Sequence, residues 1–158
     1  MRAVSTSLTL TLKSRFMKSR YQDIKPFITK DGSLIRELMH PDVHGNANQS
    51  LAEATVPVGV TTLLHKHVQS EEIYYISAGT GLMRLGDSRF DVQAGDCISI
   101  APGTPHNIRN TGDQPLSILC SCAPQYRHED TVIFDEENGD EEKGDEEKGD
   151  EEVGRDWQ

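Results

Sequence analysis

Short runs of β-branched, aliphatic and aromatic residues follow one another along the middle of the chain, separated by glycine, proline and aspartate. Val, Ile, Leu, Thr and Tyr dominate the runs, whereas residues that favour turns fill the gaps, which is typical of short strands joined by tight connections. We therefore predict strands at Ser33–His40, Leu51–Val58, Thr61–His67, Glu72–Ser77, Gly81–Leu85, Arg89–Val92, Asp96–Ile100, His106–Arg109 and Leu116–Cys122.

The fold class follows from the number and spacing of these strands. No helix-length window in this region has a helical period of apolar residues. The segment Leu85-Gly86-Asp87-Ser88 is typical of a tight hairpin, because glycine adopts positive φ at little cost. Many short strands at close spacing predict an all-β protein, an antiparallel sandwich or barrel.

The charge of the chain is concentrated at one end. Its net charge is -10, but the tail from residue 135 to residue 158 holds 13 of the 26 acidic residues and 3 of the 16 basic ones. The other 134 residues therefore carry 13 acids and 13 bases and are neutral overall. The tail repeats Glu-Glu-Lys-Gly-Asp and has almost nothing apolar to bury, so we predict that it is disordered.

The other end is basic and polar. Residues 1–20 contain Arg2, Lys13, Arg15, Lys18 and Arg20 and no acid. They form a targeting-like extension, or else residues 1–16 lie upstream of a true start at Met17, and we expect disorder in both cases. One domain, residues 21–134, remains between the two ends, and it is large enough for a core without disulfides.

Composition also limits partners and location. The folded part has no basic stripe, so we expect no nucleic-acid partner. The apolar run Ala3–Leu12 is too short and too polar to cross a bilayer, so we expect no membrane partner. Cys97, Cys120 and Cys122 make a poor disulfide framework, which favours reduced cysteines that fill apolar space in a cytoplasmic protein. A Cys-x-Cys metal clamp is less favoured, because structural zinc sites space their cysteines more widely.

A cluster of candidate metal ligands is the most informative chemical feature. His65 and His67 stand two residues apart on a predicted strand, so their imidazoles point to the same side. Glu71 and Glu72 follow, and strand alternation alone does not choose between them because a turn intervenes. His106 lies on a distant segment. Three imidazoles and one carboxylate suit a divalent transition metal better than calcium or magnesium, which prefer oxygen ligands.

The spacing around these ligands resembles the two sequence motifs of the cupin superfamily, specifically its small single-barrel members. The first motif is matched by Gly59, His65, His67, Glu72 and Gly79, at the family's intervals. The second motif is matched by Gly95, Gly103, His106 and Asn110. One position departs from it, because Ala101 stands where the family has proline. The resemblance covers roughly residues 33 to 123.

The resemblance implies a jelly-roll β-barrel whose interior holds one divalent metal on His65, His67, Glu72 and His106. The motif spacing selects Glu72 rather than Glu71 as the carboxylate ligand. Iron, manganese, nickel and zinc are all consistent with the family. Similar small cupins commonly pair through edge strands, so we expect a homodimer.

The neighbours of the ligands predict the lining of a pocket. If Glu72 points inward, alternation also turns Tyr74 and Ile76 inward, while Ile108 shares the side of His106. Arg36, on an early strand, could bind a carboxylate group of a substrate, or it could simply face solvent.

Two kinds of function fit a barrel with a full ligand set. The first is a metal-dependent enzyme, an isomerase, lyase or dioxygenase, that acts on a small oxygenated metabolite such as a sugar or organic acid. The alternative is a non-catalytic protein that binds or senses a small ligand or the metal. A purely structural barrel would not need the ligands. The sequence does not assign catalytic residues.

Overall fold

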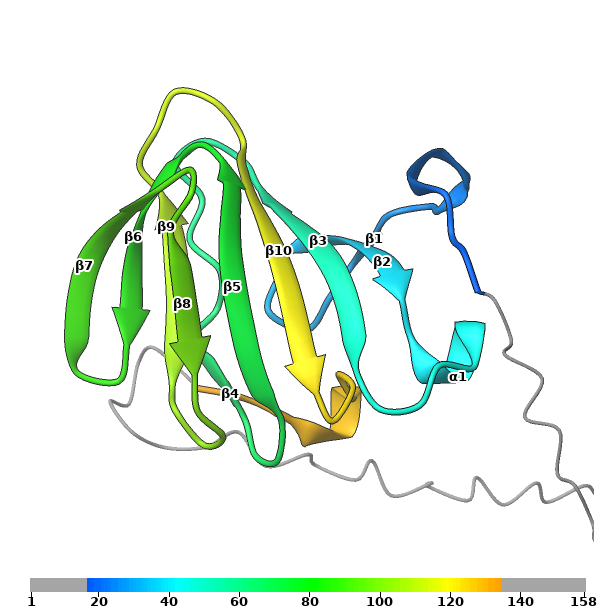
Figure 1. The fold of residues 1–158 in the computed structure, drawn as a ribbon. Helices are drawn as coiled ribbons and strands as arrows, with labels where there is room; N and C mark the ends of the chain where they lie inside the picture. The colour runs from blue at the N-terminus through cyan, green and yellow to red at the C-terminus, as the bar shows by residue number, and fades with distance from the viewer. Residues whose placement is uncertain (1–16, 135–158) are drawn as a thin grey trace, which may run out of the picture.

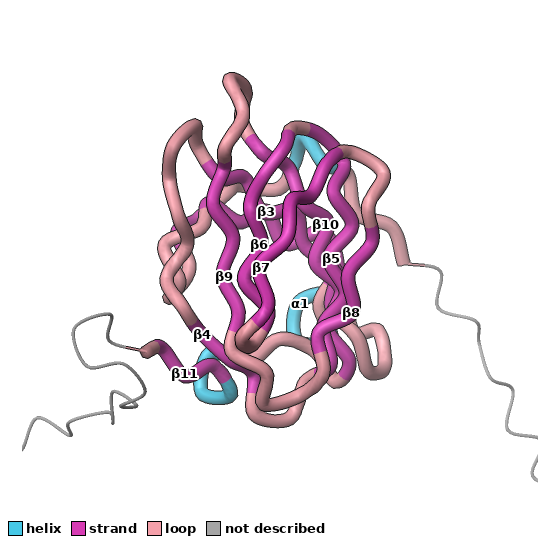
Figure 2. The backbone as a smooth tube through the Cα atoms, turned by 90° about the vertical axis from the view of Figure 1, so that its left-hand side faces the viewer, coloured by secondary structure: helices cyan, strands magenta, loops and turns pink. Residues whose placement is uncertain are grey.

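The computed structural model describes residues 17–134 and consists of two antiparallel sheets that face each other (Figures 1 and 2). The first sheet has the strand order β1 (Phe27–Ile28), β2 (Leu34–Met39), β3 (Ser50–Val56), β10 (Leu116–Ala123), β5 (Glu71–Ala78), β8 (Cys97–Ile100). The second has the order β11 (Thr131–Ile133), β4 (His65–His67), β9 (His106–Asn110), β6 (Thr80–Leu85), β7 (Ser88–Gln93). The all-β antiparallel prediction is confirmed.

Among residues 17–134, helical structure is confined to single turns. The helix α1 spans Pro41–His44, and 3-10 turns span Tyr21–Asp23 and His128–Asp130. Within the described residues, none of these segments has the length and apolar character needed to cross a membrane. The predictions for residues 1–16 and for the acidic tail lie outside the described residues.

The interior of the sheets is formed by alternate residues of each strand. Along β5 the inward residues Glu72, Tyr74 and Ile76 are buried, whereas Ile73 and Tyr75 remain 40% and 43% exposed, as alternation predicted. The core collects such inward residues from both sheets, and its most buried members include Ile76, Met83, Ile108, Leu116 and Ile118.

Most strands form within one or two residues of their predicted bounds, and the hairpin between β6 and β7 has the predicted two-residue turn, with Leu85 paired to Ser88. The prediction of one continuous strand over Thr61–His67 was wrong, because only His65–His67 is strand. Upstream of it the chain leaves the sheet. Thr61 forms an isolated bridge, the Thr62 hydroxyl accepts the backbone N–H of Ile108, and the Leu63 N–H donates to Asp31 instead.

The strands β1 and β11 and the helical turns were not predicted. The two strands are two and three residues long and leave no readable period of apolar residues. Both are close to the site described next. The strand β11 pairs with β4, and β1 extends the first sheet beyond β2.

A candidate metal centre inside the barrel

The two histidines of β4 point to the same side of the strand, as their spacing predicted. His65 and His67 are 3% and 4% exposed, while Lys66 between them is only partly buried. The strand β9 pairs with β4 through a single register pair, His65 opposite His106. Cross-strand pairing therefore brings the distant histidine to the pair, and the rings of His65 and His106 lie 4.2 Å apart between centroids.

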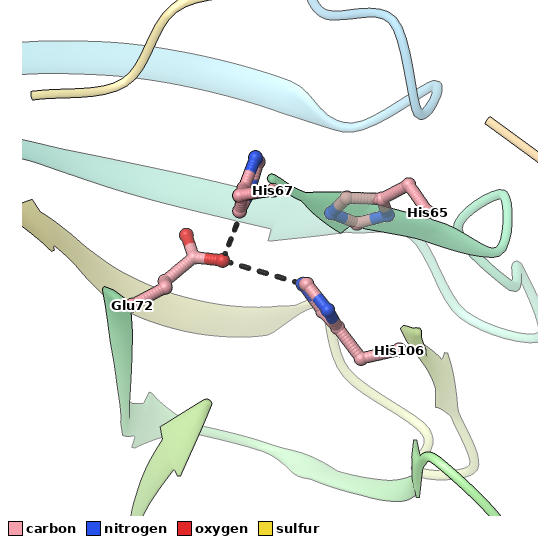
Figure 3. Close-up of side chains that lie close together, drawn as sticks. All are labelled: His65, His67, Glu72 and His106. Atoms are coloured by element: carbon pink, nitrogen blue, oxygen red, sulfur yellow. Dashed lines mark hydrogen bonds and ion pairs between the residues drawn. The ribbon is translucent and has the colours of Figure 1, made fainter. Parts of the chain in front are cut away.

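Glu72 reaches the histidines from the other sheet. The turn before β5 is held by the buried carboxylate of Asp130, which accepts the backbone N–H groups of Gln69 and Ser70. Beyond this turn Glu72 faces inward and is 4% exposed, whereas Glu71 is exposed. Oε2 of Glu72 lies 3.1 Å from Nε2 of His67 and 3.3 Å from Nε2 of His106 (Figure 3).

A hydrogen bond from Nδ1, one of the two ring nitrogens, orients each imidazole. Nδ1 of His65 donates to the carbonyl of Leu63, and Nδ1 of His106 donates to the carbonyl of Thr104, both at 2.9 Å. Nδ1 of His67 donates to the hydroxyl of Thr131 at 3.1 Å, because that hydroxyl itself donates to a backbone carbonyl. With Nδ1 occupied, the neutral form of each ring carries its lone pair on Nε2.

Electrostatics distinguish the members of the cluster. Burial and the neighbouring His106 lower the pKa of His65 to about 4, so this ring is neutral at pH 7. Burial also lowers the pKa of His67, but the hydrogen bond and negative charge of Glu72 outweigh it and raise the pKa. Burial alone would raise the pKa of Glu72, yet contacts from His106 and His67 lower it well below its usual range, so Glu72 is an anion.

The donor set fits a transition metal. One donor atom from each of the four residues lies within 4.8 Å of every other. Two donors bonded to one ion at ~2.1 Å are at most ~4.2 Å apart, so small side-chain shifts would let all four contact the same ion. Nε2 of His106 is buried and forms no hydrogen bond with the described residues, although it lies 3.3 Å from the carboxylate of Glu72. At His67 a proton on Nε2 or a cation must offset the facing carboxylate. A bound metal would satisfy both atoms.

A pocket opens beside the four residues. It encloses about 620 Å³ of empty space, open solvent at its mouth included, and His65, His67 and Glu72 form part of its wall. The strands β2 and β3 contribute apolar side chains, and polar groups come from the loop before β2 and from β11. The wall includes Phe27, Ile35, Ala52, Ala54, Asp31, Glu37, Ser50, Tyr126 and Thr131.

The other residues expected to line the pocket have different positions. Tyr74 is part of the pocket wall. Ile76 and Ile108 face the same interior but lie farther along their strands, in the apolar core. Arg36 does not line the pocket, because the alternation of β2 turns Ile35 and Glu37 inward instead. Its guanidinium group donates to the carbonyl of Ile24 and stacks over the ring of Tyr21.

Several residues of the site were not singled out by sequence reasoning. Cys122 was interpreted as an apolar filler, but its thiol donates to Oε1 of Glu72 at 3.5 Å, and burial raises its pKa far above the usual range. Cys120 faces the same pocket. The i, i+2 spacing of the two cysteines on β10 could have revealed their common inward direction. Thr131 had no comparable signal, because its position depends on how the short strand β11 pairs.

Fold and donor set together define a class of protein. A barrel of two antiparallel sheets holds three histidines and one glutamate at the positions of the cupin motifs, and the family model described as "Cupin domain" matches residues 52–122. The chain belongs to the cupin family, and its fold is the jelly-roll barrel of that family.

Known proteins similar to this chain include a relative without an assigned function and one named for oxalate binding. An uncharacterized protein of Methanocaldococcus jannaschii, MJ1618, is 58% identical over 121 residues, which cover 77% of this chain and 97% of that protein. A protein of Thermotoga maritima named oxalate-binding protein is 35% identical over 86 residues, 54% of this chain and 67% of that protein. The crystal structure of a predicted oxalate decarboxylase of Thermotoga maritima superposes with a TM-score of 0.59 at 29% identity, covering 66% of this chain and 96% of the other.

Proposed function

We propose that His65, His67, Glu72 and His106 bind one divalent transition metal, iron, manganese, nickel or zinc, and that the chain is an enzyme acting on a small oxygenated molecule. The observation that carries the proposal is the orientation of the imidazoles. Hydrogen bonds at the three Nδ1 atoms leave Nε2 of each ring as the donor atom for a metal, and Nε2 of His67 and of His106 faces the carboxylate of Glu72. Nε2 of His106 has no hydrogen bond with the described residues. A buried polar atom without a partner destabilises a fold unless something else satisfies it.

Several residues of the pocket would support such chemistry. A divalent metal at this centre would polarise a carbonyl or hydroxyl oxygen of a bound ligand. The hydroxyl of Tyr74 forms no hydrogen bond with another described residue, and it belongs to a side chain of the pocket wall. Burial raises the pKa of Tyr74 well above its usual value, so this hydroxyl keeps its proton and can donate it to a ligand oxygen.

A binding protein without catalysis is the second candidate. It is favoured by the relative from Thermotoga maritima, whose name describes binding rather than turnover. The same pocket and the same ligand set would serve either role.

Turnover by the metal-loaded protein separates the two candidates. Purified chain loaded in turn with each of the four metals would be incubated with small diols, hydroxyketones and organic acids, with substrate loss followed by NMR and dioxygen uptake by electrode. We expect turnover with at least one metal, and none in the His106→Ala control. Binding without turnover in every combination would contradict the enzyme and support the binding protein.

The homodimer and the cytoplasmic location also remain proposals. Ile73 and Tyr75 leave apolar surface on the outer face of β5, which a second subunit could cover. Light scattering from the purified chain is expected to give twice the mass of 17.6 kDa. A monomer mass across the micromolar range would overturn the dimer.

A further inference from the structure

We propose that the pocket selects a neutral hydroxylated compound with an apolar part, and that it discriminates against dicarboxylates such as oxalate. This inference rests on the proposed function, because it concerns the ligand of the same metal centre. It differs from what the two names printed for Thermotoga maritima, oxalate-binding protein and predicted oxalate decarboxylase, suggest for their bearers.

The charged side chains on the pocket wall are mainly acidic. Besides the histidines, the wall has Asp31, Glu37 and Glu72, and no lysine or arginine of residues 17–134 lines it. Lys30 lies between the wall residues Thr29 and Asp31 in sequence but is not part of the wall. Its ammonium group donates a hydrogen bond to the backbone carbonyl of Thr131 at 3.0 Å. A dicarboxylate is usually bound by a guanidinium or ammonium group beside any metal.

The carboxylates of Asp31 and Glu37 differ in whether other residues already hydrogen-bond to them. Asp31 accepts hydrogen bonds from the hydroxyls of Thr29 and Ser33 and from the Ser33 N–H, so local contacts use its oxygens. The side chain of Glu37 has no ion pair or hydrogen bond with another residue of the described chain. The half-buried Glu37 carboxylate is therefore a free acceptor for a hydroxyl group, and it repels a second carboxylate.

A count of charges gives the same result. A divalent ion together with Glu72 carries about +1, and the addition of Asp31 and Glu37 brings the pocket to about -1. A dianion would enter a site that is already negative, whereas a neutral ligand meets no such repulsion. Phe27, Ile35 and the small Ala54 form apolar wall that a ligand made only of two carboxylates would leave uncovered.

Catechol and oxalate are the probes for this inference, since each presents two oxygens to a metal. Free catechol is neutral at pH 7, because a phenol loses its proton near pH ~10, and titrations in two buffers would count any proton that it releases at the metal. After elemental analysis of the loaded protein, calorimetry would measure both affinities at one ionic strength. We expect catechol to bind at least about tenfold more tightly than oxalate. Tighter binding of oxalate would overturn the inference.

Two matched variants identify the source of the discrimination. Glu37→Gln removes one negative charge inside the pocket, and Glu71→Gln removes one outside it, on the exposed face of β5. We expect Glu37→Gln to strengthen oxalate binding about tenfold and to leave catechol within about twofold, while Glu71→Gln changes neither. Equal effects of the two variants on oxalate would contradict the role of Glu37.

The metal measurement separates this inference from the proposed function. Protein that takes up no metal overturns the proposed function, and the wall can still be tested by ligand-observed NMR on that protein. Catechol signals that respond to Ile35→Asp but not to Ile73→Asp would support an apolar pocket for a neutral ligand. Saturable binding of oxalate to the metal-free protein would overturn the inference.

Discussion

The two ends of the barrel interior are built by the same strands and differ in chemistry. The strands β5, β9 and β10 each contribute an inward polar residue toward one end of the barrel and an inward isoleucine farther along the strand. The pairs are Glu72 and Ile76, His106 and Ile108, Cys122 and Ile118. At one end the side chains pack into a closed apolar core, and at the other they leave a pocket beside four candidate metal ligands.

The comparison separates what maintains the fold from what would perform chemistry. Strand alternation decides only that a residue points inward. The position along the strand then decides whether it joins a core of aliphatic side chains or a group of buried donors. Changes at the closed end should therefore affect stability, and changes at the open end should affect metal binding.

The largest effect is expected at the closed end. Ile118→Ala removes a side chain that is 1% exposed, and it should lower the free energy of unfolding by about 2–5 kcal/mol through lost burial and a cavity. Urea unfolding of the metal-free protein measures it. Ile73→Ala, on the exposed face of β5, should cost less than about 1 kcal/mol. Equal costs would contradict the division.

Acid should destabilise the metal-free protein through the open end. His65 has a folded pKa of about 4, below its ordinary value of ~6.5, so the unfolded chain takes up this proton first as the pH falls. The free energy of unfolding should decrease by up to about 3 kcal/mol between pH 6.5 and pH 4. Unfolding curves at several pH values should show a smaller loss in His65→Gln than in the wild type, whereas the exposed-residue variant His128→Gln should keep the full loss. An unchanged pH dependence in His65→Gln would contradict the assignment.

Removal of the hydroxyl group that orients His67 should weaken metal binding. Thr131→Val deletes the hydroxyl that accepts from Nδ1 of His67, so the imidazole loses its fixed direction. We expect the metal affinity to fall about 10–100-fold in a competition with a chelator. Thr131→Ser, which keeps the hydroxyl, and Thr55→Val, away from the pocket wall, should bind like the wild type. An unaffected Thr131→Val would remove Thr131 from the site.

The smallest expected effect is at Cys122. Its thiol is a weak donor to Oε1 of Glu72, so Cys122→Ala should lower the metal affinity by less than about tenfold. Cys120→Ala is the matched control, since Cys120 also lines the pocket but donates to the backbone of Ile118 instead. The same chelator competition compares the two, and a loss confined to Cys120→Ala would reverse their roles.

Local sequence patterns predicted most of the strands, and they predicted that the four candidate ligands lie together. Strand alternation and motif spacing can both be recognised in the sequence. The strand β2 shows why the pocket wall was harder. Its sequence, Leu-Ile-Arg-Glu-Leu-Met, does not alternate apolar and polar residues, so the direction of Arg36 could not be predicted from it. Likewise, Thr131 and Phe27 reach the pocket through the long-range pairing of very short strands, which leaves no local signal.

Metal content measured by elemental analysis tests the central claim most directly. Chain purified without chelator and supplied with iron, manganese, nickel or zinc should retain one ion per chain, and the His106→Ala variant should retain none. The exposed-residue variant His128→Ala should bind like the wild type. Wild-type protein that stays free of metal under all four conditions, or a His106→Ala variant with full occupancy, would contradict the account.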